Sequence, residues 1–173
     1  GKYLWDRERR CYLRMIYRDG NGEWQQDETV DASLVGLWYF GMLPADDPAV
    51  VATMETVERR LTVRAESGGL ARYENDYYHQ VSDDVGRVPG NPWFITTLWL
   101  AQWRLAVAGE EGDLNRPRAS IQWAADRALP SGVMAEQIHP HSNVPLSITP
   151  LTWSHATMDA SVRQYMAVAA KLG

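Results

Sequence analysis

The most constraining feature of the sequence is an alternation between two kinds of helix. Residues 31–43 and 91–109 carry large apolar side chains around every side of a helix. Residues 48–62 and 113–129 instead have one apolar stripe with charged residues opposite it. A helix that is apolar all round is buried on every side, whereas a helix with one stripe lies at the surface. Buried and surface helices therefore alternate along the chain, and a fifth helix is predicted over residues 150–172.

The connectors between these helices differ in length in a regular way. Turns from a buried helix to a surface helix are short, over residues 43–48 and 109–113. Connectors from a surface helix back to a buried one are long, over residues 63–90 and 129–149. The pattern predicts an all-α fold of consecutive αα-hairpins that form part of an α/α toroid. In such a ring the long connectors share one end, together with residue 30, and a site is expected there.

The predicted helix starts carry capping signals. A side chain that can cap the helix is found at each start, and in three of the four cases proline follows in the first turn: Asp31, Asp47–Pro48, Asn91–Pro92 and Thr149–Pro150. Upstream of these helices, residues 1–30 are interpreted as irregular. Within that region a short extended piece is predicted over residues 11–17 and a turn over residues 20–22.

Composition bounds the class of protein. A chain of 173 residues is long enough for a single domain, residues 1–173, with its own core. The net charge of −5 argues against a nucleic-acid partner or an anionic membrane surface. The single cysteine, Cys11, excludes a disulfide within the chain, and no apolar run reaches membrane-spanning length. We therefore expect no nucleic-acid partner, no membrane association and a cytoplasmic setting.

The stretch from Met134 to Trp153 has neither a helical nor a strand period. A loop of about twenty residues inside a compact domain is usually functional or disordered. This one has few charges and several apolar residues, which disfavours disorder. It carries one acid, Glu136, followed directly by the amide of Gln137.

Three motifs give this region a family resemblance. The first combines Glu136-Gln137, Pro145-Leu146-Ser147 and Leu151-Thr152-Trp153-Ser154; the others are Gly90-Asn91-Pro92-Trp93-Phe94 and Ala71-Arg72-Tyr73-Glu74. In this order they resemble the C-terminal catalytic segment of family 15 glycoside hydrolases, the glucoamylases and their relatives. The resemblance implies an (α/α)6 barrel of six hairpins, of which this chain supplies the C-terminal part.

The resemblance also implies a chemistry. Relatives of this kind are inverting, exo-acting enzymes that release glucose from α-glucans, and inversion requires two carboxyl groups. The resemblance assigns the general base to Glu136. The family places its general acid in an upstream Trp-Glu motif, and no Trp-Glu dipeptide occurs here. Glu74 and Asp76 are the nearby substitutes, but the family uses that loop to hold sugar, so we expect this chain alone to be inactive.

The substrate-binding residues are predicted from both chemistry and resemblance. Arg72 offers a planar fork of donors to vicinal hydroxyls, although an ion pair with Glu74 or Asp76 explains it equally well without the family. Trp93 and Trp153 begin predicted buried helices at the loop-bearing end, which favours walls of a sugar pocket over core packing. Trp99 and Trp103, deeper in their helix, are interpreted as core. The predicted set is Arg72, Tyr73, Glu74, Asn91, Trp93, Gln137 and Trp153.

Several alternatives stay open. Within the family, the substrate could be trehalose instead of an α-glucan or a small α-glucoside. In a different class, the chain could be a non-catalytic α/α scaffold that binds sugar or protein. His139 and His141 lack a third ligand nearby, so no metal is predicted, and no cofactor either. A partial ring leaves apolar faces uncovered, so self-association through its open edge is expected.

Overall fold

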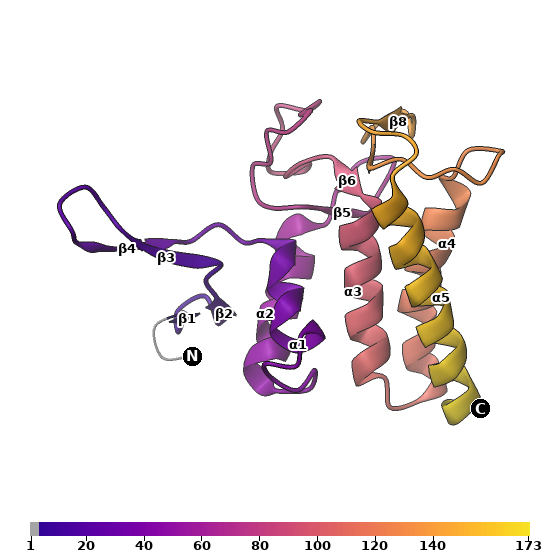
Figure 1. Cartoon of the computed structure of the whole chain (residues 1–173), viewed down its shortest axis with the longest axis horizontal. Coiled ribbons are helices and arrows are strands. Elements are labelled where there is room, and N and C mark those ends of the chain that lie inside the picture. Colours follow the sequence, from indigo (N-terminus) through magenta and orange to yellow (C-terminus); the bar gives the residue numbers. More distant parts are fainter. Residues whose placement is uncertain (1–3) are drawn as a thin grey trace.

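The computed structural model describes residues 4–173, and helices dominate it (Figure 1). Five α-helices and two 3-10 helices are present in this part of the chain: η1 Ala32–Val35, α1 Gly36–Tyr39, α2 Pro48–Leu61, α3 Phe94–Val107, η2 Glu111–Leu114, α4 Asn115–Asp126 and α5 Thr152–Leu172. Short strands are also present: β1 Trp5–Asp6, β2 Cys11–Tyr12, β3 Met15–Arg18, β4 Trp24–Asp27, β5 Leu70–Ala71, β6 Pro92–Trp93, β7 Gln137–Ile138 and β8 Pro145–Leu146. The fold is therefore mainly helical, and the prediction of a strictly all-α chain is wrong.

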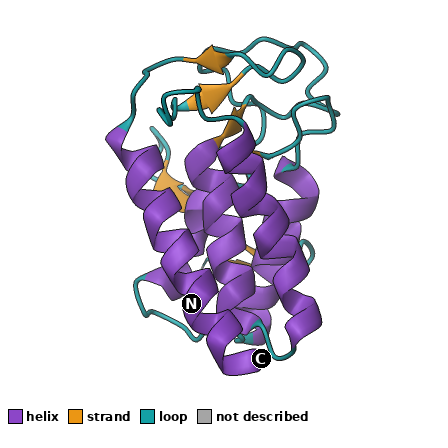
Figure 2. Cartoon of the chain, turned by 90° about the vertical axis from the view of Figure 1, so that its right-hand side faces the viewer, coloured by secondary structure: helices purple, strands orange, loops and turns teal. Residues whose placement is uncertain are grey.

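The helices lie side by side, and the long connectors gather at one end of them. Figure 1 shows α3 in the middle, with α1 and α2 on one side and α4 and α5 on the other. Figure 2 shows most of the loops and several of the short strands gathered above the helices, while the C-terminus lies at the opposite end. The prediction that both long connectors share one end is confirmed.

Helix α3 separates two hydrophobic cores. Leu100 and Trp103 face a core shared with α2, η1 and β2, which also includes Val50 and Met54. Phe94 and Leu98 face a second core with α4 and the connector after it. Residues on all sides of α3 are thus buried, as its all-round apolar pattern predicts.

Helix α2 follows its predicted pattern closely. Its apolar stripe is fully buried, and the charged residues on the other side reach solvent. Asp47 caps it by accepting from the backbone nitrogen of Ala49 at 2.8 Å, and Pro48 occupies the first turn. The stripe consists of Val50, Met54, Val57 and Leu61.

The first predicted helix is shorter and less buried than expected. Asp31 does cap it, accepting from the backbone nitrogen of Ser33 at 2.8 Å. The helical segment ends at Tyr39, because Gly41 turns the chain with a positive φ of 73°. Phe40 is 84% exposed, since nothing in residues 4–173 covers it. The predicted helix to residue 43, buried on every side, is therefore wrong in its second half.

Two predicted capping sites are strands or extended chain instead. Pro92 and Trp93 form β6, which pairs with β5 and β7, so α3 begins at Phe94 and Asn91 does not cap it. The peptide before Pro150 is cis, and α5 begins two residues later at Thr152. In both places, backbone hydrogen bonds to a neighbouring connector pair N–H groups that a capping side chain would otherwise pair.

The last two helices also differ from expectation. The pattern of residues 113–129 predicts that Ala125 faces the core, but in α4 the buried alanine is Ala124 and Ala125 is exposed. Helix α5 was expected to be buried, but its buried residues are only Ser154, Thr157 and Ser161. It is covered on one face by α3 and α4 and is open on the other.

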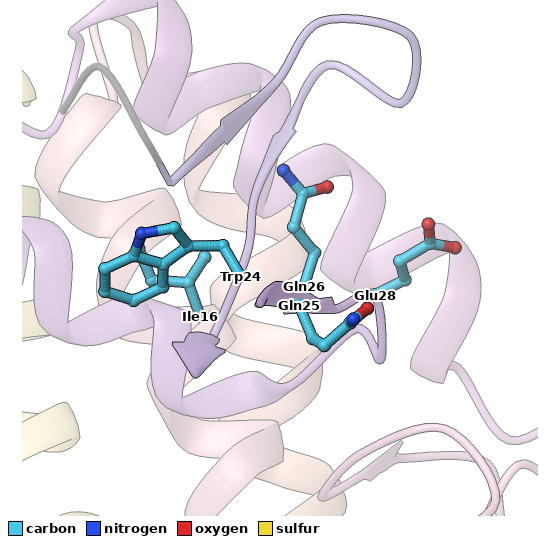
Figure 3. A pocket seen from close by; sticks show the side chains of 5 residues that line it. All are labelled: Ile16, Trp24, Gln25, Gln26 and Glu28. Carbon is cyan, nitrogen blue, oxygen red and sulfur yellow. The ribbon is translucent and has the colours of Figure 1, made fainter. Parts of the chain in front are cut away.

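The N-terminal region forms two hairpins and is not irregular. Strands β1 and β2 pair, and β3 pairs with β4 around a turn in which Gly22 has a φ of 82°. The predicted extended piece and turn are confirmed, and residues 1–3 lie outside the described residues. Figure 1 shows the β3–β4 hairpin projecting away from the helices. A hollow of about 760 Å³ lies along it, lined by Ile16, Trp24, Gln25, Gln26 and Glu28 (Figure 3).

Candidate functional site

A pocket of about 420 Å³ lies where the two long connectors meet the helix ends. It brings together five of the eight residues predicted for the site, and it lies apart from the larger hollow on the β3–β4 hairpin. The hairpin hollow contains none of the predicted residues. The pocket is lined by Asp31, Ser33, Arg72, Tyr73, Trp93, Ile95, Thr96, Trp99, Glu136 and Trp153.

A four-stranded sheet in the order β5-β6-β7-β8 positions the pocket residues. Trp93 lies in its centre, opposite Leu70 on one side and Gln137 on the other. Arg72 therefore follows the strand on one side of Trp93, and Glu136 precedes the strand on the other. The predicted convergence of Arg72 and Glu136 at one end of the helices is confirmed.

The Glu136 carboxylate is held by neutral donors. The Ser147 hydroxyl donates to Oε2, and the side-chain amide of Gln137 donates to the same oxygen at 3.4 Å. The backbone nitrogen of Glu136 donates to the carbonyl of Ile148 at 2.9 Å, which fixes the residue in the connector. No lysine or arginine within residues 4–173 forms an ion pair with Glu136. The partly exposed carboxylate thus faces the pocket without a cationic partner among residues 4–173.

Arg72 is held by a carboxylate and surrounded by rings. Asp76, only 1% exposed, accepts from its Nε at 2.9 Å and from a terminal nitrogen at 2.8 Å. The guanidinium also lies 4.7–5.3 Å from the ring centres of Tyr73, Tyr78 and Trp93. Burial by itself lowers the pKa of Arg72, but the hydrogen bonds and charge of Asp76 outweigh this and leave the pKa raised. Arg72 therefore forms an ion pair with Asp76 and lines the pocket at the same time.

Glu74 lies outside the pocket. One carboxylate oxygen pairs with Arg60, and the other accepts from the backbone nitrogen of Val30 at 2.9 Å. The backbone of Glu74 also donates to the carbonyl of Val30 at 3.0 Å. Glu74 therefore anchors the chain just before Asp31, while its neighbour Tyr73 lines the pocket.

Asn91 and Gln137 are buried behind the pocket and do not line it. Asn91 is 1% exposed and Gln137 is fully buried. The Asn91 amide nitrogen donates to the Gln137 amide oxygen at 2.9 Å and to the carbonyl of His79 at 2.7 Å. The structure therefore places these two predicted substrate residues behind the side chains that line the pocket.

The two predicted wall tryptophans lie in different environments. Trp93 is nearly buried, and its indole nitrogen has no hydrogen-bond partner within the described residues. Trp153 is 53% exposed and packs edge-on against Trp99, with ring centres 5.6 Å apart. Trp99 is partly buried and packs against the first hydrophobic core, as its interpretation predicts, and it also lines the pocket. Trp103 is buried as predicted and donates to the carbonyl of Ala45.

Sequence reasoning missed other pocket residues. Asp31 and Ser33 belong to the start of the first inner helix, which is at the same end as Trp93 and Trp153. The criterion that favours the tryptophans, a position at the loop-bearing start of an inner helix, therefore applies to Asp31 and Ser33 as well. Asp31 also accepts from Arg14 at 3.1 Å, a contact between distant segments that no local pattern indicates. The missed residues are Asp31, Ser33, Ile95, Thr96 and Trp99.

Two findings on the described residues concern metals and membranes. No group of three or more His, Cys, Asp or Glu side chains in residues 4–173 is arranged to hold a metal ion. The ring of His141 instead lies 2.8 Å from the Glu66 carboxylate. None of the helices in the same residues combines the length and apolarity needed to cross a bilayer.

Comparison with protein families gives one match and several relatives. The family model described as glycosyl hydrolases family 15 matches residues 6–119. An uncharacterized glycosyl hydrolase of Methanocaldococcus jannaschii is 34% identical over 140 residues, which is 75% of this chain and 21% of that protein. An isomaltose glucohydrolase of Kribbella flavida is 29% identical over 163 residues, which is 87% of this chain and 36% of that protein. The chain thus spans between a fifth and just over a third of these relatives.

A solved structure shares the fold. It is a bacterial glucoamylase in complex with acarbose, which superposes with a TM-score of 0.66 at 20% sequence identity. The match covers 93% of this chain and 27% of the glucoamylase chain. Nearly the whole described structure therefore corresponds to one portion of a much longer protein.

Proposed function

Because the chain belongs to glycosyl hydrolase family 15, we propose that residues 1–173 are the C-terminal part of a single catalytic domain. In this proposal the helices are consecutive αα-hairpins of an (α/α)6 toroid, and other segments of the complete protein close the ring. The complete protein is an inverting, exo-acting glycoside hydrolase that releases glucose from α-glucans or small α-glucosides. The lengths of the relatives and the shared fold of the glucoamylase support this proposal.

The observation that carries the proposal is the position of Glu136. Its carboxylate faces the same pocket as Arg72 and three tryptophans, and neutral donors hold it without an ion pair to any of the described residues. Glu136 acts as the general base: it takes a proton from a water while the water oxygen attacks the anomeric carbon. The bond to the leaving oxygen breaks on the opposite face of the ring, and a second carboxyl group protonates that oxygen. The product glucose then has the inverted, β configuration.

The other pocket residues bind and orient the sugar. Arg72, already fixed by Asp76, offers its remaining donors to vicinal hydroxyls of the glucose beside the cleaved bond. Tyr73, Trp93 and Trp153 supply aromatic surface against the apolar faces of the rings. Glu74, Asn91 and Gln137 support the site from outside the pocket.

The general acid is supplied by another part of the complete protein. The second pocket carboxylate in residues 4–173 is Asp31, and it is already used by Arg14 and by the cap of η1. Without a proton donor the leaving group departs as an alkoxide, and a positioned acid contributes about 10² to 10⁴ in rate. Residues 1–173 alone therefore release no glucose.

A substrate panel with product analysis tests the proposal. The complete protein is incubated with maltose, isomaltose and trehalose, and NMR follows the ratio of the two glucose anomers before mutarotation. The reducing-end glucose of maltose or isomaltose leaves as a mixture of anomers, so we expect β-glucose in excess of that mixture from the cleaved α-bond. Cleavage of trehalose alone would favour the trehalase alternative, and an early excess of α-glucose would overturn the inverting mechanism. Sugar binding without cleavage of any of the three would support a non-catalytic scaffold.

A further inference from the structure

Two buried amides connect the Glu136 carboxylate to the opposite connector. Asn91 precedes β6 and Gln137 begins β7, and neither side chain reaches the pocket. Their hydrogen bonds form a line from the His79 carbonyl through Asn91 and Gln137 to Glu136 Oε2. The line therefore joins the connector that carries Arg72 to the connector that carries Glu136.

The direction of every bond in this line follows from its first member. A backbone carbonyl can only accept, so Asn91 must turn its amide nitrogen toward His79. The same nitrogen lies 2.9 Å from the Gln137 amide, which must therefore present its oxygen. The Gln137 nitrogen is then left pointing at the Glu136 carboxylate, where it lies 3.4 Å from Oε2. A flipped Gln137 would set its nitrogen against that of Asn91 and its oxygen against the carboxylate.

The arrangement is not what stability alone would select. Asn91 and Gln137 are buried, and the Asn91 amide oxygen has no partner among the described residues. An unpaired buried polar atom is unfavourable, and apolar residues of the same shape can replace a buried polar pair at little cost. His79 also has a left-handed backbone with a φ of 53°, a conformation that non-glycine residues seldom adopt. Such departures concentrate at functional sites.

We propose that Asn91 is a positioning residue for Glu136 and acts through Gln137, an inference that rests on the proposed role of Glu136. Asn91 fixes the polarity of the Gln137 amide, so a donor and never an acceptor faces the carboxylate. Ser147 donates to the same oxygen, which leaves Glu136 Oε1 for the attacking water. The 3.4 Å contact is long in the unliganded pocket, and bonds at catalytic groups commonly tighten when substrate is bound.

The test uses two conservative variants in the complete protein. Gln137→Met keeps the side-chain length and removes the donor, while Asn91→Asp keeps the shape but replaces the donor with acceptors. Asn91→Asp also forces Gln137 to flip its oxygen toward Glu136. Displacing a catalytic group by about 1 Å can cost on the order of 10² in rate. We expect kcat to fall by roughly 10- to 100-fold in both variants, with KM within about twofold of wild type.

A matched control separates positioning from structural damage. Gln102 is another buried glutamine whose amide oxygen has no partner among the described residues; it donates to Ser161 at 3.0 Å and does not line the pocket that contains Glu136. Gln102→Met should disturb packing to a similar extent and leave kcat unchanged. Thermal unfolding of all variants shows which of them remain folded.

A double-mutant cycle with Glu136→Gln then decides the question. If Asn91 acts only through Glu136, neither Asn91→Asp nor Gln137→Met lowers the residual kcat further in the Glu136→Gln background. A full additional loss in that background would overturn the proposal, and so would a rise in KM with unchanged kcat. Wild-type kcat in Glu136→Gln alone would instead overturn the proposed function.

Discussion

Helices α3 and α5 have similar predicted environments and different observed ones. Most of α3 is buried, with neighbours on both sides within the chain. The buried residues of α5 are all small and carry hydroxyl groups: Ser154, Thr157 and Ser161. Large apolar residues such as Met166, which is 65% exposed, lie on the face that nothing in residues 4–173 covers.

The difference shows what an apolar pattern does and does not specify. It indicates that a side chain is buried in the complete fold, without saying which segment covers it. For α3 the covering segments lie within residues 4–173, whereas one face of α5 is covered by none of these residues. The small hydroxyl stripe lets α5 approach α3, where Ser161 meets Gln102 at 3.0 Å. The pocket shows the same contrast: Trp93, just before α3, is buried, whereas Trp153, in α5, is exposed.

The largest expected effect is the loss of kcat when Glu136, in the pocket of the complete protein, is replaced. Replacing Glu136 by Gln keeps size and hydrogen-bonding shape but removes the ability to accept a proton. We expect kcat to fall by about 10² to 10⁴ with little change in substrate binding. Azide, small enough for the water position, should restore turnover and give a β-configured glycosyl azide. Steady-state kinetics and NMR of the product check both expectations.

The matched control for that variant is Glu74→Gln. Glu74 lies outside the pocket and pairs with Arg60, so its loss should reduce stability and leave kcat near wild type. If Glu74→Gln abolishes turnover while Glu136→Gln does not, the assignment of the base is wrong.

The next effect compares packing in the two helices. Leu98→Ala removes a fully buried side chain of α3 and should lower the free energy of unfolding by about 2–5 kcal/mol. Met166→Ala on the open face of α5 should change it by less than about 0.5 kcal/mol. Urea denaturation of residues 1–173 measures both values. Equal losses would mean that α5 is already covered in solution, for example by a second copy.

The third effect compares two Arg–Asp pairs of the same spacing. Arg72 and Asp76 form a pair with a buried carboxylate, whereas Arg163 and Asp159 on α5 form an exposed pair. Asp76→Ala leaves Arg72 without its partner and should lower the free energy of unfolding by about 1–3 kcal/mol. The loss should be smaller than for a fully buried pair, because Arg72 is partly exposed. Asp159→Ala should cost no more than about 0.5 kcal/mol. If urea denaturation gives the same loss of unfolding free energy for both variants, the buried and the exposed pair contribute equally and this expectation is wrong.

The smallest effect concerns association through the open faces. Exposed apolar groups on α5 and around Phe40 should make residues 1–173 self-associate at high concentration. Met166→Lys should weaken that association by about tenfold, or about 1.4 kcal/mol. Sedimentation equilibrium gives the association constant. A wild-type chain that stays monomeric at high concentration would contradict this expectation.

Sequence reasoning succeeded where a repeating pattern specifies the structure. The stripe of α2 and the all-round apolar pattern of α3 predicted both helices and their burial. The order of long and short connectors predicted that Arg72 and Glu136 would meet. Which pocket residues contact substrate remains a prediction.

The failures have a common physical cause. Strands of two residues are too short to show a period, so the sequence predicts a helix start at β6, with Asn91 as its cap. Because the short strands are not predicted, the burial of Gln137 is not predicted either: its environment comes from strands distant in sequence. The openness of α5 could not be predicted, since an apolar pattern does not say which segment covers it.

The four-stranded sheet also determines when the pocket forms. Its strands β5, β6 and β7 come from three separate parts of the chain, and each contributes only two residues. Such short pairings cannot offset the entropy of closing the intervening loops, so helix packing must come first. During synthesis, α2 and α3 leave the ribosome well before β7, and domains generally complete their folding as units. Glu136 therefore joins the pocket only after β7 has been synthesised and has paired, and a nascent chain that still lacks β7 has an incomplete pocket.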